Sequence, residues 1–271
     1  MLSIKVLSNN NHVFLKNLPT NKYVEITPFP KEEEQELQKG IFQDDLHAVI
    51  INQCNVYFNI ICTLIKKRIP IFLFDFYNLP LDKAKTLLDL SEEAASYVQV
   101  KSSNRFIFKE INYWSFIENP QLISITRSFD INQNDDIIEI IYLEIENIIA
   151  ILKSKPRKIS PIQILEKTED IQTIDFRIEF DNGAILKMTI SSVLPEKTHT
   201  LEFIKWNNYQ KIDLINCTYT SNKEIEKFIK TEDPKSSEVL HFCSNLLYNK
   251  LPEVNIEDGL ITIELIDKII Y

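Results

Sequence analysis

Glycine is the residue that this sequence most clearly lacks. Only three occur among 271 residues, and none precedes Gly40, whereas average usage would give roughly nineteen. A loop that wraps the phosphates of a nucleotide needs glycine, because its backbone takes positive φ angles and approaches the ligand closely. The chain is rich in Ile, Asn and Lys, which explains much of the low total. A glycine-rich nucleotide loop is nevertheless excluded.

Other absences narrow the class of protein. The four cysteines have no C-x-x-C spacing and are too few for a disulfide scaffold. No charged start followed by an apolar stretch suggests export, and no apolar run approaches the ~20 residues that a bilayer requires. The net charge is −9, whereas nucleic-acid binding needs clustered Lys and Arg. No two histidines have the spacing of metal ligands. We expect a cytoplasmic protein with no membrane segment, nucleic-acid partner or metal.

The first hundred residues alternate short apolar runs with helical patterns. The predicted strands are 4–7, 23–26, 48–51, 71–74 and 97–100, and the predicted helices are 12–18, 31–39, 55–68 and 81–95. Consecutive apolar residues, as in 48–51, are typical of parallel strands buried on both faces. Strands separated by helices predict right-handed crossovers, and therefore a Rossmann-like parallel α/β domain over residues 1–101.

Residues 102–271 follow a different pattern, which predicts an α+β domain. The predicted helices are 136–152, 237–250 and 259–270, and the predicted strands are 171–180, 184–192, 201–206 and 211–219. Asp181-Asn182-Gly183 joins two alternating runs and predicts a tight hairpin. We expect an open-faced, mostly antiparallel sheet with helices on one face.

The strands of this second domain predict how the protein assembles. Phe176, Ile178 and Phe180 alternate with charged residues, so one face of the sheet is strongly apolar. An exposed apolar patch of more than a few hundred Å² is uncommon on a monomer. We expect a homodimer, or a larger assembly, through the C-terminal sheet, with isologous pairing as the default. The alternative is that the helices bury the apolar face and leave a polar outer face and a monomer.

Several strings, in order along the chain, carry a family resemblance. Residues 46–55 (LHAVIINQCN), a helix and residues 71–74 (IFLF) resemble the D-A-V-I-I-x-T-P-N, helix and L-V-E-K-P of the glucose–fructose oxidoreductase and inositol dehydrogenase family (Gfo/Idh/MocA). Residues 180–184 (FDNGA) are similar to its F-x-N-G-A hairpin, and residues 251–259 to its P-x-x-s-x-x-D-G ending. The resemblance implies the two-domain fold of NAD(P)-dependent oxidoreductases, with the open sheet as subunit interface.

The dinucleotide site that the resemblance implies is degenerate in this sequence. The family's G-x-G-x-x-G falls on residues 8–13, which begin with Ser8, Asn9 and Asn10 and contain no glycine. Asn tolerates a positive φ, but it still brings a Cβ and an amide toward the pyrophosphate. The acidic residue that would bind the adenosine ribose falls near residues 27–29, which have no carboxylate. We therefore expect no cofactor, or NAD or NADP if the chain is a working oxidoreductase.

The catalytic positions that the resemblance implies have changed as well. The E-K-P lysine aligns with Asp75 and the histidine of D-x-x-x-H with Glu144, while the family asparagine is kept as Asn55. Hydride transfer needs a base for the alcohol proton and a cation near the developing alkoxide. Asp75 and Glu144 could accept a proton, so they are the candidate catalytic residues, but neither stabilises an alkoxide. Otherwise Asp75 begins a turn and Glu144 lies at a solvated helix edge.

Three functions stay open on the sequence. The first is a pseudoenzyme, which keeps the oxidoreductase-like fold but has lost dinucleotide binding and hydride transfer and acts by binding or assembly. The second is a working NAD(P)-dependent oxidoreductase on a sugar-like or cyclic polyol substrate, with rewired residues. The third is a small-molecule sensor that uses the old cleft. The missing glycines, lysine and histidine favour the first over the second.

Overall fold

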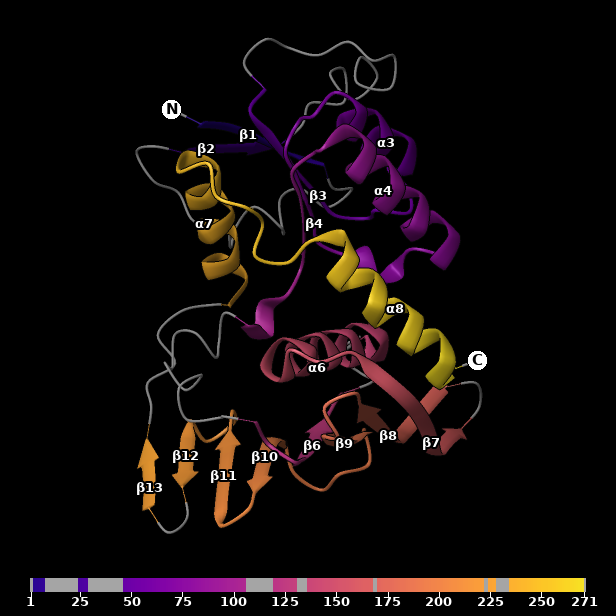
Figure 1. The fold of residues 1–271 in the computed structure, drawn as a ribbon, viewed down its shortest axis with the longest axis vertical. Helices are drawn as coiled ribbons and strands as arrows, with labels where there is room; N and C mark the ends of the chain where they lie inside the picture. Colours follow the sequence, from indigo (N-terminus) through magenta and orange to yellow (C-terminus); the bar gives the residue numbers. More distant parts are fainter. Residues whose placement is uncertain are drawn as a thin grey trace. The chain divides into compact units, whose positions relative to one another are not determined.

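The computed structural model describes residues 2–7, 24–28, 46–105, 119–130, 136–167, 170–221, 224–227 and 234–270. The chain forms two compact units (Figure 1): Met1–Phe106 with Glu232–Glu264, and Ile107–Thr231 with Leu265–Tyr271. The predicted helices at 12–18 and 31–39, and the loop that begins with Ser8, Asn9 and Asn10, lie outside the described residues.

The first unit contains the predicted parallel sheet. Its strands are β1 (Leu2–Leu7), β2 (Val24–Pro28), β3 (Ala48–Ile51), β4 (Ile71–Leu73) and β5 (Val98–Val100). They pair in parallel in the order β2-β1-β3-β4-β5. The Rossmann-like prediction is therefore confirmed, and β3 matches its predicted bounds because four consecutive buried residues leave little choice of register.

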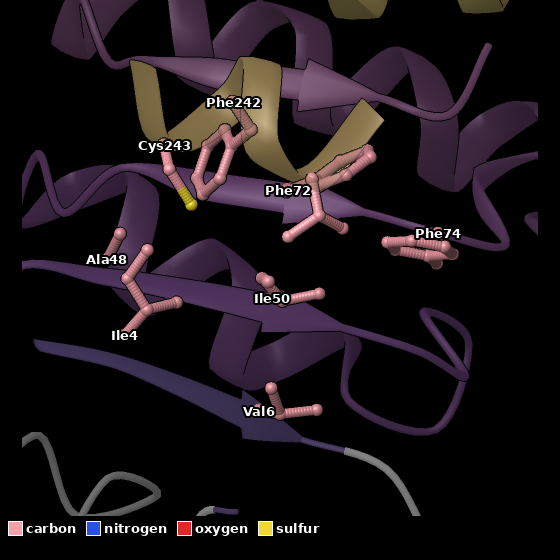
Figure 2. Close-up of a cluster of buried hydrophobic side chains, with 9 residues drawn as sticks. Ile4, Val6, Ala48, Ile50, Phe72, Phe74, Phe242 and Cys243 are labelled. Carbon is pink, nitrogen blue, oxygen red and sulfur yellow. The ribbon is translucent and has the colours of Figure 1, made fainter. Parts of the chain in front are cut away.

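Helices cover both faces of this sheet. Alternate strand residues such as Ile4, Ile50 and Phe72 form a buried cluster with Phe242 and Cys243 of α7 (Pro234–Leu247), as Figure 2 shows. The intervening strand residues point to the opposite face, where α3 (Phe58–Lys66) and α4 (Leu81–Ala94) lie in Figure 1.

The packing of α7 bears on the domain boundary. The sequence pattern predicts that all of 102–271 belongs to the second domain, whereas the structure groups Glu232–Glu264 with the N-terminal residues. The aromatic rings of Phe72 and Phe242, whose centroids are 5.3 Å apart, are part of this packing. The last helix, α8 (Ile256–Ile270), contributes its first residues to the first unit and Leu265 onward to the second.

The second unit is an eight-stranded sheet with a long helix, α6 (Ile137–Leu152). Its strands are β6 (Leu122–Ser128), β7 (Pro156–Lys167), β8 (Asp170–Phe180), β9 (Ile185–Ser191), β10 (His199–Lys205), β11 (Asn208–Asp213), β12 (Thr218–Ser221) and β13 (Glu224–Lys227). The order is β13-β12-β11-β10-β6-β9-β8-β7, and only β6 and β9 pair in parallel among these strands. The predicted mostly antiparallel sheet is confirmed.

Local predictions in this unit have mixed outcomes. The hairpin is confirmed: Gly183 has φ +83° and its N–H donates to the Phe180 carbonyl at 2.9 Å. The single strand predicted at 211–219 is wrong, because a turn separates β11 from β12. The Asp213 carboxylate accepts the N–H groups of Ile215 and Asn216 and holds that turn.

The apolar residues behind the dimer prediction are not a free surface. Phe176, Ile178 and Phe180 are fully buried within the single chain. The opposite face of the sheet carries ion pairs, among them Arg177–Glu179 at 3.2 Å. This is the polar outer face that the alternative described, so the homodimer loses its main argument and stays a prediction.

Candidate functional site

Asp75 lies at the carboxyl edge of the parallel sheet, the edge at which open α/β sheets bind ligands. Its Oδ1 accepts the backbone N–H of Cys54 at 2.8 Å, which ties the loop after β4 to the loop after β3. Its carbonyl accepts the N–H of Asn78 and begins the 3₁₀ turn η1 (Phe76–Asn78). The half-buried carboxylate of Asp75 therefore fixes the backbone of the loop after β3. Asp75 also begins a turn, as the alternative interpretation predicted.

Two lysines that the sequence analysis missed reach the same edge. Lys83 of α4 donates from Nζ to the Oδ1 of Asn55 at 2.6 Å, and its Nζ lies 5.1 Å from the ring centroid of Phe58. Lys101, directly after β5, is only 4% exposed, with its Nζ 5.7 Å from the Phe74 ring centroid. The edge therefore has cations, although the aligned lysine is replaced by Asp75.

Cys54 is not a nucleophile in this setting. Burial raises the pKa of its thiol well above the usual value, and the charge of Asp75 raises it further. A thiol kept in its neutral form is a poor nucleophile and metal ligand. The Cys54 side chain is fully buried and contributes to packing in the loop that Asp75 holds.

Glu144 lies in an ion-paired cluster in the second unit, which we call the Glu144 triad: Glu144, Arg127 and His199. Arg127 Nη1 donates to Glu144 Oε1 at 2.5 Å, and His199 Nε2 is 2.9 Å from the same oxygen. The ring nitrogen makes an ion pair without good hydrogen-bond alignment. Glu144 is 0% exposed, so the expectation of a solvated helix edge is wrong.

The strand register explains why the triad forms. Arg127 of β6 and His199 of β10 are direct cross-strand partners, next to the buried pair Ile125 and Leu201 on the same face. Two basic groups placed side by side need a counter-charge. Glu144 of α6 supplies it from the helix that covers this face.

The electrostatics of the triad fix the charge of Glu144. Burial alone would raise the pKa of Glu144, but the nearby His199 and the charge and hydrogen bond of Arg127 outweigh it and lower the pKa from 4.5 to about 2. The second oxygen, Oε2, is buried and makes no hydrogen bond with any described residue. The carboxylate is thus ionised at neutral pH and is a weak base.

A cavity of about 540 Å³ opens beside the triad. Arg127 and His199 line it, together with the segment from Ser192 to Thr198 that joins β9 to β10 and with Ile215. All of these residues belong to the second unit. Among the described residues, no group of three or more His, Cys, Asp or Glu side chains is placed to hold a metal ion. The described helices include none of the length and apolarity that crossing a membrane requires.

Comparison with known proteins defines the fold. No protein-family model matches the chain, and no curated protein sequence matches it significantly. Among solved structures, UDP-N-acetylglucosamine 3-dehydrogenase GnnA from Acidithiobacillus ferrooxidans matches with a TM-score of 0.78 and 13% identity, over 99% of this chain and 96% of that one. The dehydrogenase MviM from Clostridium difficile matches with a TM-score of 0.77 and 12% identity, over 99% and 98%. Aldose-aldose oxidoreductase from Caulobacter crescentus matches with a TM-score of 0.75 and 11% identity, over 99% of this chain and 96% of that one.

These likenesses establish the fold and its class. The chain has the two-domain fold of the Gfo/Idh/MocA-type dehydrogenases and oxidoreductases, so the resemblance predicted from sequence is confirmed at that level. Identities of 11–13% show the fold alone. A shared fold does not determine function, which depends on the residues of the site.

Proposed function

We propose that this protein uses a dehydrogenase fold to bind a small molecule, and that it neither binds a dinucleotide with useful affinity nor transfers hydride. The carrying observation is Glu144, at the position that aligns with the family's histidine. It is fully buried, ion-paired to Arg127 and His199, and has a pKa of about 2. A general base works best with a pKa near the operating pH, so this carboxylate is unsuited to accept the proton of an alcohol.

Asp75 supports the same proposal. It aligns with the family's lysine, and its carboxylate is engaged by the backbone N–H of Cys54. It carries no positive charge for a developing alkoxide. Both aligned positions therefore hold structure together in this chain, while the cavity beside the triad offers space for a ligand.

The test is titration with NADH and with NADPH, followed by thermal stability and by calorimetry. A ligand that binds only the folded chain stabilises it by about 2.7 kcal/mol at a hundred times its Kd. We expect no stabilisation and no saturable heat. An active dehydrogenase of the same fold, measured in parallel, gives the signal that binding produces. A micromolar Kd for either dinucleotide refutes the proposal.

A working oxidoreductase is the second candidate, and His199 is the observation that favours it. Its imidazole lies 2.9 Å from the Glu144 carboxylate and lines a cavity, and a carboxylate-held imidazole is a recurring general base. On this candidate a dinucleotide binds, and His199→Gln lowers turnover without changing dinucleotide affinity.

We also propose that the protein works in the reducing cytoplasm. All four cysteines are free, and Cys54 and Cys243 are buried within the first unit. Extracellular proteins more often pair their cysteines.

A further inference from the structure

We propose that the cavity of the second unit binds the carboxylate group of a small organic acid, with the guanidinium of Arg127 as its main contact. The proposal goes beyond the loss of hydride transfer, because it assigns a site and a ligand class. It rests on residues of the second unit alone.

The guanidinium of Arg127 has N–H donors that no described residue accepts from. Its Nη1 is bound to Glu144 Oε1, and this is the only hydrogen bond that its guanidinium makes with the described residues. The Nε–Nη2 edge stays available, the side chain is 22% exposed, and the residue lines the cavity. Such an edge presents two parallel N–H groups, which match the two oxygens of a carboxylate.

The guanidinium is held in place before any ligand arrives. Glu144 binds it from α6, and the pairing of Arg127 with His199 fixes its position in the sheet. A group that is already immobilised loses less entropy when it binds. Glu144 therefore acts as a positioning residue, and Arg127 and His199 face the cavity.

The wall of the cavity is also ordered by hydrogen bonds. The N–H of Ser128 donates to the Thr198 carbonyl at 2.8 Å, and the N–H of Thr198 donates to Ser128 Oγ at 2.8 Å. The N–H of Ser192 donates to the Gln172 carbonyl at 2.9 Å. The segment between β9 and β10 is thus fastened at both ends, and the cavity is preformed as ligand sites usually are.

The apolar part of the lining suits the body of an organic acid. Val193 and Ile215 are exposed at 63% and 49%, and Leu194 and Pro195 lie between the fastened ends. The volume of about 540 Å³ falls within the range typical of small-molecule sites. These apolar side chains lie among polar and charged ones, since Ser128, Asp130 and Gln172 also line the cavity.

The charged residues that line the cavity favour an anion beside Arg127 and His199, which form its less exposed wall. Glu196 and Lys197 are both exposed, have opposite signs and are screened by water. Asp130 also lines the cavity and makes contacts of its own. Arg127 is a permanent cation and only 22% exposed, with His199 beside it at 12%, so the guanidinium acts in a medium where charge interacts more strongly. One guanidinium edge fits a carboxylate better than a phosphate dianion, which takes more donors.

The experiment is a calorimetric titration of the full chain with four probes. Phenylacetate carries the carboxylate, phenylacetamide is its uncharged counterpart, phenyl phosphate tests phosphate, and inositol tests a neutral polyol. We expect phenylacetate to bind at least about tenfold more tightly than phenylacetamide, which is the size of a charge-assisted hydrogen bond. Equal binding of the two, tighter binding of phenyl phosphate or inositol, or no saturable binding of phenylacetate overturns the assignment.

Variants locate the site. The double variant Arg127→Gln/Glu144→Gln removes both buried charges together, so neither is left alone in the fold, and we expect it to lose phenylacetate binding by about tenfold or more. Arg177→Gln is the matched control, since Arg177 is on the opposite face of the sheet, and it should bind as the parent does. Unchanged binding in the double variant refutes the proposal. NADH titrated into the same samples tests the loss of dinucleotide binding separately.

Discussion

Replacement of Glu144 by glutamine is the most direct test of the Glu144 triad. Glu144→Gln keeps the size of the side chain and removes its charge. Arg127 and His199 then face each other across β6 and β10 without a counter-charge. We expect a large loss of stability from a change of one atom.

The magnitude follows from the pKa of Glu144. Lowering this pKa from 4.5 to about 2 means that the folded chain favours the ionised carboxylate by about 3 kcal/mol, at ~1.4 kcal/mol for each tenfold change. Breaking a buried ion pair by removal of one partner costs about 3–5 kcal/mol in other proteins. We therefore expect Glu144→Gln to lower the free energy of unfolding by about 3 kcal/mol at pH 7.

The assay is urea unfolding followed by circular dichroism, with Glu202→Gln as control. Glu202 is 34% exposed, accepts the hydroxyl of Tyr209 at 3.1 Å and pairs with Lys211 at 3.6 Å. Exposed pairs of this kind contribute about 1 kcal/mol or less. If Glu144→Gln costs no more than Glu202→Gln, the carboxylate is not the centre of a buried triad and the reasoning is wrong.

Three further predictions concern pH, Asp75 and assembly. Because the folded chain holds the pKa of Glu144 low, its stabilisation is present above pH 4.5 and lost as the pH falls toward about 2; this loss should be absent from Glu144→Gln in acid titrations of stability. Asp75→Ala should cost about 1–3 kcal/mol in urea unfolding by leaving the Cys54 N–H unpaired. Asp75→Asn keeps the acceptor and should cost less, yet should abolish any turnover that depends on Asp75. For the homodimer, light scattering should give twice 31.8 kDa. Trp206→Ser should weaken the dimer, because the exposed Trp206 lies in the turn beside the paired, partly exposed Ile204 and Leu122 of the open face.

The sequence predicted those strands whose burial requires a run of consecutive apolar residues. Residues 48–51 are apolar throughout because both faces are covered. β7 was missed because Pro156 and Pro161 weaken a strand pattern. The structure places β7 at the sheet edge, with register shifts beside both prolines, where proline is tolerated. β6 was missed although Ile123 and Ile125 alternate with polar residues in the way of a half-buried strand.

The candidate site was harder to predict, because its residues meet only through tertiary pairing. Glu144 was found by alignment, but its burial depends on Arg127 and His199, which are brought together by the antiparallel register of β6 and β10. Because the sequence pattern did not predict β6, it did not single out Arg127, which lies in that strand. His199 was set aside because no second histidine has ligand spacing, a criterion that detects metal sites and not ion-paired clusters. Lys101 escaped notice because it follows β5 and not the aligned β4.

In the Glu144 triad, the acidic residue lies on the helix α6, where the family pattern has a histidine, and the histidine lies on a strand. The basic side chains therefore face the cavity. In the family pattern the helix carries the histidine; here α6 carries Glu144, and a histidine comes from β10 as His199. The carboxylate is the fully buried member, while the two basic side chains keep 12–22% of their surface exposed. A ligand in the cavity therefore meets positive charge, with the compensating negative charge behind it. An uncharged polyol gains little from such a wall, whereas an organic anion replaces water at a guanidinium that is already held in place.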